Sequence, residues 1–205
     1  MRNRPAGLLV GITGGIGSGK STVCGILRDR GRTVFSADEI GAHVSLHHSR
    51  VRSEIMRAFG TLDREELASV VFSNPRKLAT LNRIIHPVVI REISRSIRSL
   101  PQRRRYPYVV VESALLFEAK LSGHFDFVVL VDAPLELRLK RRSGKTLTKA
   151  EIRRRARNQL PAPLKRRQAD FVLSNRGSQR DLRSAVFLVD GILTRMAKKY
   201  RPEGR

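Results

Sequence analysis

Residues 11–22, which read GITGGIGSGKST, decide the fold of this chain. Within them, Gly14–Ser21 match the pattern G-x-x-x-x-G-K-[ST]. Leu8–Thr13 form an apolar run typical of a buried strand, and Thr22–Arg30 follow the glycines with helical spacing. Glycines in such a strand, loop and helix let successive backbone N–H groups converge on phosphate oxygens at the start of the helix. The sequence therefore predicts a nucleotide-binding phosphate loop.

Short apolar runs alternate with helical patterns along the rest of the chain. The expected strands are 32–35, 108–112, 127–132 and 169–173, and the expected helices include 38–59, 63–98, 134–142 and 179–200. Proline is disfavoured in the interior of a helix. The dipeptides Asn-Pro at 74–75 and His-Pro at 86–87 therefore predict breaks in the helical region 63–98. Strands that alternate with helices indicate a doubly wound α/β fold with a parallel sheet.

Length and composition limit the possible classes of protein. The 205 residues suit one main domain, and Lys and Arg exceed Asp and Glu by 23 charges. Such a charge attracts polyanions, although a solvated basic face is the simpler interpretation of many of these residues. Cys24 is the only cysteine, so an intrachain disulfide is excluded. With no run of membrane-spanning length, we expect a soluble, cytoplasmic protein that makes no membrane contact.

Chemistry at the phosphate loop requires residues from several elements. Lys20 is expected to reach the β- and γ-phosphates, and the Ser21 hydroxyl is expected to ligate Mg²⁺. Asp38 follows the second expected strand, where a carboxylate is placed to accept a proton from an acceptor hydroxyl. Asp38 also suits the N-cap of the following helix, and both interpretations stay open at this point.

Arginine-rich helices on either side of residues 143–148 (SGKTLT) suggest a lid. Arg138, Arg141 and Arg142 precede this turn and 153–155 follow it, so at least one of them is a candidate to contact the transferred phosphoryl group. Glu112 ends its strand near the loop. A role in holding a Mg²⁺-bound water and a pairing with an arginine are both open for this carboxylate.

An ordered series of motifs resembles the dephospho-coenzyme A kinase family over nearly the whole chain. The motifs are GITGGIGSGKSTV at 11–23, SADEIG at 36–41, VVFSNP at 70–75, LNRIIHPVV at 81–89, ESALLFE at 112–118, RLKRR at 138–142 and ADFVLSNRGS at 169–178. A phosphate loop alone occurs in many families, whereas this series is much more specific.

The resemblance implies a P-loop kinase-like parallel sheet with helices on both faces, a helical acceptor-binding lobe and a small lid. A single domain would span 8–200, with the lobe at about 44–99, the lid at about 138–158 and basic tails at 1–7 and 201–205. The implied activity is phosphorylation of the ribose 3′-hydroxyl of dephospho-coenzyme A by ATP with Mg²⁺.

The resemblance also implies roles for individual residues. Asp38 matches the catalytic base and contacts the acceptor, Arg141 resembles the lid arginine, and His86 lies in the acceptor lobe as a substrate-binding candidate. Asn175 and Gly177 fall where the family closes over the adenine of ATP. The implied nucleotide-binding residues in the loop are Gly15, Gly17, Ser18, Gly19, Lys20, Ser21 and Thr22.

The chain departs from the family pattern at several positions. Ser36 replaces an Asp, Ala114 replaces a Pro, and the segment after Gly60 is shorter than usual. SGKTLT lacks an Arg-Asp pair that is often present, and Lys145 is a candidate substitute.

Two alternative functions stay open beside the implied one. Another small-molecule or nucleoside monophosphate kinase would share this architecture, and a nucleic-acid-binding P-loop NTPase would exploit the positive charge. Trp is absent and aromatic residues make up only 5% of the chain, so few stacking platforms support binding of nucleic acid. No specific nucleic-acid partner is therefore expected, and the oligomeric state is not predicted.

Overall fold

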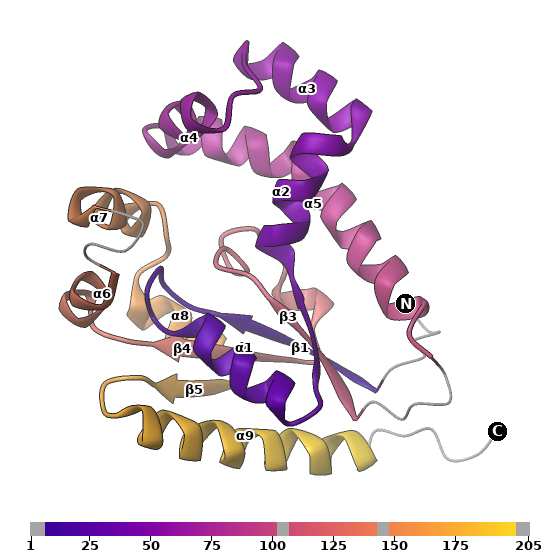
Figure 1. The fold of residues 1–205 in the computed structure, drawn as a ribbon, viewed down its shortest axis with the longest axis vertical. Coiled ribbons are helices and arrows are strands. Elements are labelled where there is room, and N and C mark those ends of the chain that lie inside the picture. Colours follow the sequence, from indigo (N-terminus) through magenta and orange to yellow (C-terminus); the bar gives the residue numbers. More distant parts are fainter. Residues whose placement is uncertain (1–6, 102–106, 143–147, 200–205) are drawn as a thin grey trace.

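A parallel sheet of five strands forms the centre of the molecule (Figure 1). The computed structural model describes residues 7–101, 107–142 and 148–199. The strand order is β2-β3-β1-β4-β5, and every neighbouring pair is parallel. This arrangement confirms the predicted doubly wound α/β fold. The strands are β1 (Leu8–Thr13), β2 (Thr33–Ser36), β3 (Tyr108–Glu112), β4 (Phe127–Asp132) and β5 (Phe171–Ser174).

Helices follow most of the strands and cover both faces of the sheet (Figure 1). In the described part of the chain they are α1 (Lys20–Asp29), α2 (Ala37–His47), α3 (Ser49–Phe59), α4 (Arg64–Phe72), α5 (Pro75–Arg98), the 3₁₀ helix η1 (Ser122–His124), α6 (Leu135–Arg142), α7 (Lys149–Arg157), α8 (Ala162–Gln168) and α9 (Gln179–Lys199). None of these helices is both long enough and apolar enough to cross a membrane.

Alternate residues of the strands supply two separate apolar cores, because successive side chains of a strand point to opposite faces. Val10 and Val110 belong to the core that packs against α1 and α9. Val109 and Val111 belong to the core on the other face, where the C-terminal half of α5 packs. A sheet covered in this way leaves its carboxyl edge as the place where ligands can approach.

Helices α2, α3, α4 and the first half of α5 rise above this carboxyl edge (Figure 1). They share an apolar cluster of their own, in which Val44, Val51, Ile55 and Val88 are buried. Helix α5 is long enough to contribute both to this cluster and to the core that contains Val109 and Val111 on one face of the sheet. It therefore connects the lobe to the sheet.

Two predicted helix boundaries are wrong. The single helix expected at 38–59 is two helices, because His48 adopts an extended conformation between them and its ring nitrogen accepts a hydrogen bond from the Val51 N–H at 3.4 Å. The break expected at Pro87 does not occur, and α5 continues through it. Pro87 and Arg83, whose carbonyl loses its helical donor, are both exposed. Water can therefore replace the missing hydrogen bond.

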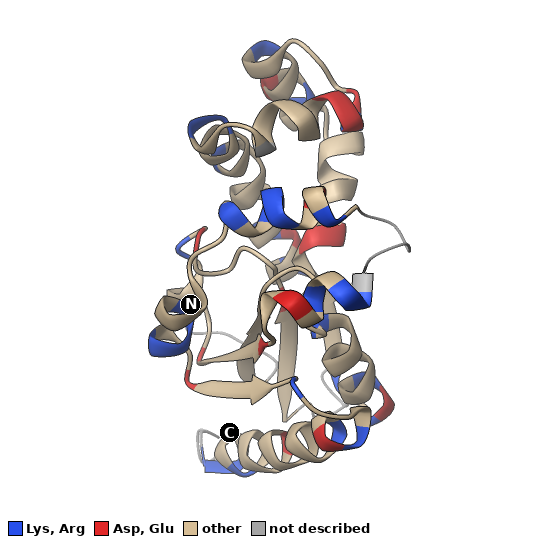
Figure 2. Ribbon diagram, turned by 90° about the vertical axis from the view of Figure 1, so that its left-hand side faces the viewer, with Lys and Arg blue, Asp and Glu red and all other residues tan. Residues whose placement is uncertain are grey.

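The large positive charge is spread over the helices rather than concentrated on one element. Lys and Arg occur along the lobe, the α6–α7 pair and α9, whereas the five strands of the described chain contain none (Figure 2). This distribution agrees with solvated basic helix faces for many of these residues.

Candidate functional site

The phosphate loop connects β1 to α1 and depends on glycine at defined positions. Gly17 and Gly19 have φ values of 76° and 101°, in the left-handed region that side chains disfavour. A Cβ atom on Gly14 would lie 2.3 Å from the Val131 carbonyl oxygen, and one on Gly19 would lie 2.2 Å from Nδ2 of Asn175. The close packing of β4 and the β5–α9 connection around the loop thus explains its glycines.

Lys20 is the first residue of α1 and lies buried at the carboxyl edge of the sheet. Its ammonium group donates a hydrogen bond to the Gly14 carbonyl at 3.2 Å. Burial lowers the pKa of Lys20, and the neighbouring carboxylates of Asp38 and Glu112 oppose this shift. The ammonium group is thereby held between the loop and two carboxylates.

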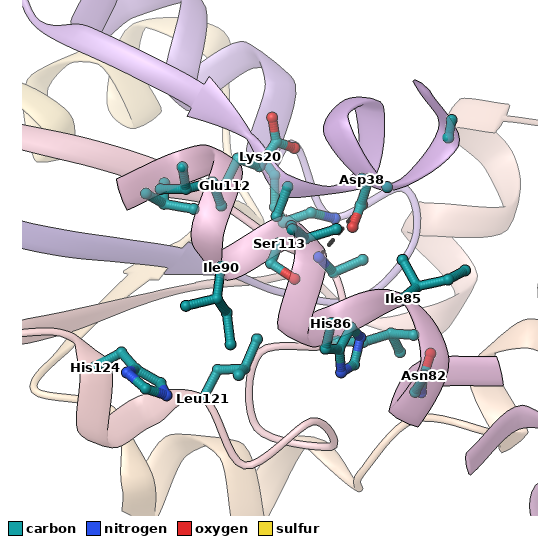
Figure 3. Close-up of a pocket in the computed structure, with 18 of the residues that line it drawn as sticks. Lys20, Asp38, Asn82, Ile85, His86, Ile90, Glu112, Ser113, Leu121 and His124 are labelled. Carbon is teal, nitrogen blue, oxygen red and sulfur yellow. Dashed lines mark hydrogen bonds between the residues drawn. The ribbon is translucent and has the colours of Figure 1, made fainter. Parts of the chain in front are cut away.

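Asp38 is the second residue of α2, and its carboxylate faces Lys20 (Figure 3). The N-cap of α2 is Ser36, whose hydroxyl accepts a hydrogen bond from the Glu39 N–H at 3.2 Å. The interpretation of Asp38 as the N-cap is therefore wrong. Its carboxylate is instead open to the cavity beside the loop, where the Ala114 N–H donates to Oδ2 at 3.4 Å.

Desolvation by the surrounding walls raises the pKa of Asp38, against the opposing effects of Lys20 and of the Ala114 N–H. Glu112, at the end of β3, behaves in the same way, because burial raises its pKa while Lys20 lowers it. The buried thiol of Cys24 is a neighbour of Glu112 and acts with Lys20 to lower its pKa. Two carboxylates with raised pKa values thus lie beside one lysine.

A cavity of about 500 Å³ extends from the phosphate loop between α2 and α5. Its wall is largely apolar, with Ile85 and Ile90 on α5 and Leu121 on the opposite side (Figure 3). Asn82, His86 and His124 supply polar groups along it. Burial lowers the pKa of His86. The cavity opens directly onto Lys20 and Asp38, so an acceptor bound in it can reach a phosphate held by the loop.

The arginines expected in the lid occupy different places. Arg138 reaches the phosphate loop, where its guanidinium donates to the Ile16 carbonyl at 3.5 Å, and Arg155 lines the cavity. Arg141 is exposed on α6 and is not part of the cavity wall. Residues 143–147, including Lys145, lie outside the described part of the chain.

The remaining predicted nucleotide-binding residues lie in the loop or next to it. Gly15, Gly17 and Ser18 belong to the loop, and Ser21 and Thr22 are exposed at the start of α1. Asn175 is buried behind the loop and donates to the Ser18 carbonyl at 2.8 Å. Gly177 is exposed in the turn before α9.

Several residues of the site carried no clear signal in the sequence. Gln159 ends the segment EIRRRARNQ, yet its amide contacts both the phosphate loop and the loop after β3. His124 and Asn82 enter the cavity from η1 and α5. Only the position of Asn82 within the motif LNRIIHPVV could have directed attention to it.

The side chains that could ligate a metal ion near the phosphate loop offer oxygen atoms. The described residues contain no cluster of three His, Cys, Asp or Glu side chains suited to a metal. The Ser21 hydroxyl lines the cavity beside the loop, and the Glu112 carboxylate on the same wall is a candidate to hold a Mg²⁺-bound water. These oxygen donors fit Mg²⁺ when bound phosphates complete its shell, since Mg²⁺ commonly binds through one or two carboxylates plus substrate phosphates.

Comparisons with known proteins agree on one family. Residues 8–181 match the family model described as dephospho-CoA kinase. The dephospho-CoA kinase of Thermus thermophilus is 40% identical over 203 residues, which cover 95% of this chain and 96% of that protein. The enzyme of Deinococcus radiodurans is 44% identical over 82% of this chain and 84% of its own. The crystal structure of TT1252 from Thermus thermophilus superimposes with a TM-score of 0.77 at 37% identity, covering 92% of this chain and 98% of that chain.

Proposed function

The chain belongs to the dephospho-CoA kinase family, and on this basis we propose how its site transfers a phosphoryl group from ATP to the ribose 3′-hydroxyl of dephospho-coenzyme A. The products are coenzyme A and ADP, and the reaction is the last step of coenzyme A synthesis. One observation carries the assignment of roles. The cavity opens onto the phosphate loop at the point where Lys20 and Asp38 face each other.

ATP binds along the phosphate loop, with Lys20 directed at its β- and γ-phosphates and backbone N–H groups of the loop on the phosphate oxygens. The nucleotide-binding residues that we assign are Gly15, Gly17, Ser18, Gly19, Lys20, Ser21, Thr22, Asn175 and Gly177. Ser21 would ligate Mg²⁺, and the bound ion would neutralise negative charge on the phosphates. The hydroxyl of Ser18 supports the presence of a ligand here, because it is buried without a hydrogen-bond partner in the described structure.

Dephospho-coenzyme A occupies the cavity between α2 and α5, with its ribose 3′-hydroxyl beside Asp38. Asp38 accepts the hydroxyl proton as the oxygen attacks the γ-phosphorus. Its pKa is raised toward the operating pH, and a general base is most efficient when its pKa lies near that pH. His86 lies on the cavity wall and contributes a contact to the acceptor. The apolar wall excludes water, which would otherwise compete for the phosphoryl group.

Guanidinium groups of the lid neutralise charge on the transferred phosphoryl group. The prediction for Arg141 requires the lid to move, because this side chain is exposed on α6. Arg138 and Arg155 already face the loop and the cavity, which makes them candidates for the same role. We further propose a cytoplasmic enzyme without a specific nucleic-acid partner.

A panel of acceptors tests the function most directly. Purified protein, MgATP and each acceptor in turn are assayed for ADP release, with dephospho-coenzyme A, nucleoside monophosphates and shikimate among the acceptors. Turnover with dephospho-coenzyme A alone is the expected result. Turnover of a nucleoside monophosphate without activity on dephospho-coenzyme A would overturn the proposal. ATP hydrolysis stimulated by oligonucleotides, with steep salt dependence, would favour the nucleic-acid alternative.

A further inference from the structure

Gln159 lies at the junction between the lid helix α7 and the body of the protein. Helix α7 ends at Arg157, and Gln159 follows its C-cap. The next residue, Leu160, donates its N–H to the Glu118 carboxylate at 2.8 Å, and Glu118 forms an ion pair with the buried Lys165 of α8 at 2.8 Å. The chain is therefore anchored immediately after Gln159, and α7 extends from that anchor.

The two ends of the Gln159 side chain contact two different parts of the site. Oε1 accepts a hydrogen bond from the Ile16 N–H in the phosphate loop at 3.3 Å. Nε2 donates to the Ala114 carbonyl at 3.0 Å. The N–H of the same residue, Ala114, points to the Asp38 carboxylate. A single amide thus connects the loop that holds the nucleotide with the backbone that contacts the base.

Only one orientation of the amide satisfies both contacts, because the Ile16 N–H can only donate and the Ala114 carbonyl can only accept. Glutamate at this position would lose the donor. Asparagine is shorter by one methylene group and could not span both partners. The two contacts therefore require the chemistry and the length of glutamine.

Ile16 is also contacted by the other lid helix, since Arg138 of α6 donates to its carbonyl. One peptide segment of the phosphate loop is thus contacted both by α6 and by the residue that follows the C-cap of α7. We propose that Gln159 is a positioning residue that couples docking of the lid on the phosphate loop to placement of the Ala114 backbone against Asp38. The inference rests on the proposed kinase function for its kinetic readout, but its structural readout does not depend on the acceptor.

Three variants test the proposal. Gln159→Ala removes both contacts, Gln159→Glu keeps an acceptor for Ile16 but loses the donor to Ala114, and Gln168→Ala is a control because Gln168 is exposed at the end of α8. We expect kcat to fall about 10- to 100-fold for both Gln159 variants, since small displacements of reacting groups have effects of this size. The KM for ATP should change less than about threefold, because other loop residues bind the phosphates.

The pH dependence of kcat/KM supplies a second readout. It would not change if Gln159 only stabilised the fold. In the described part of the chain, five titratable or charged groups line the cavity with Asp38, namely Lys20 on α1, Glu112 on β3, His86 on α5, His124 on η1 and Arg155 on α7, and Glu39 is its neighbour on α2. Loss of the Gln159 contact frees the Ala114 backbone and weakens its hydrogen bond to Asp38. Because that bond lowers the pKa of Asp38, the acid limb of kcat/KM should move to higher pH in Gln159→Ala, which introduces no charge of its own.

Amide hydrogen exchange at Ile16, measured in the protein without acceptor, completes the test. Faster exchange in Gln159→Ala than in the wild type and in Gln168→Ala is the expected result. Unchanged exchange, a wild-type kcat in folded Gln159→Glu, or a wild-type pH profile in Gln159→Ala would overturn the inference. If the wild type failed to phosphorylate dephospho-coenzyme A, the proposed function would fail, and the exchange measurement would still decide the role of Gln159.

Discussion

The two ends of strand β3 each lie beside a group of charged residues, and the two groups are built differently. Tyr108, at the start of the strand, donates its hydroxyl hydrogen to Asp190 of α9. Arg30 and Arg32 also donate to this carboxylate, each at 2.6 Å. Glu112, at the other end, lies with Asp38 beside the single ammonium group of Lys20. Donors surround the first carboxylate, whereas two carboxylates share one cation at the second site.

The pKa values of the two aspartates differ accordingly. Burial alone would raise the pKa of Asp190, but hydrogen bonds from Arg32, Tyr108 and Arg30 outweigh it and lower the pKa. Desolvation prevails at Asp38 and raises its pKa. The comparison teaches that a buried charge with a full set of partners serves the fold. A charge left with few partners is available for a ligand or a proton.

The largest expected effect is the loss of transfer activity in Asp38→Asn. The amide cannot accept the hydroxyl proton, so kcat should fall about 10²- to 10⁴-fold, the range typical of general base catalysis. Binding of ATP, measured by calorimetry, should be retained. Glu39→Gln is the matched control, because Glu39 is exposed in the same helical turn. A nearly unchanged kcat in Asp38→Asn, with loss in Glu39→Gln, would move the base to Glu39.

Removal of Asp190, the carboxylate with a full set of donors, should lower the stability of the fold and leave catalysis unchanged. Asp190→Ala leaves Arg30 and Arg32 near a buried site without their anion, which costs about 3–5 kcal/mol for a buried pair. The free energy of unfolding in urea measures this loss. Asp29→Asn, at an exposed position on α1, is the control. If Asp190→Ala unfolded like the wild type, the carboxylate would not be a structural anchor.

A smaller loss is expected when only one partner of Asp190 is removed. Tyr108→Phe keeps the buried ring but deletes the hydroxyl that donates to the carboxylate. A hydrogen bond to a charged group contributes about 1.5–3 kcal/mol, so the unfolding free energy should fall by that amount. The kcat of the folded variant should equal that of the wild type, because Tyr108 lies at the opposite end of β3 from the site. A reduced kcat at full folding would show that the two ends are coupled.

The order of elements could be predicted because glycine-rich, apolar and helical patterns are local properties of the sequence. The phosphate loop is an example, since its strand, glycines and helix are contiguous in 8–30. The prediction of a break at Pro87 was wrong. Solvent exposure of the folded helix decides whether proline is tolerated there, and exposure is not a local property of the sequence. Gln159 could not be identified, because its partners Ile16 and Ala114 are 143 and 45 residues away in the sequence. Its role exists only where the fold brings three segments together.

The smallest expected effect is a gain in stability when Asp38 loses its charge. Asp38→Asn removes a carboxylate that the folded state disfavours, so unfolding in urea at neutral pH without nucleotide should cost up to about 1 kcal/mol more than in the wild type. Solvent in the open cavity limits this gain.

The gain should depend on pH in a defined direction. Because the pKa of Asp38 is raised above its ordinary 3.8 in the folded state, the wild type carries the full penalty only above the raised pKa. As the pH falls through that value toward 3.8, Asp38 becomes protonated and the difference between variant and wild type should shrink. The contribution of Asp190 has the opposite sign and persists until lower pH, since its folded pKa is lowered below 3.8. An Asp38→Asn variant less stable than the wild type at neutral pH would show that Lys20 satisfies this carboxylate after all, and the contrast between the two ends of β3 would be lost.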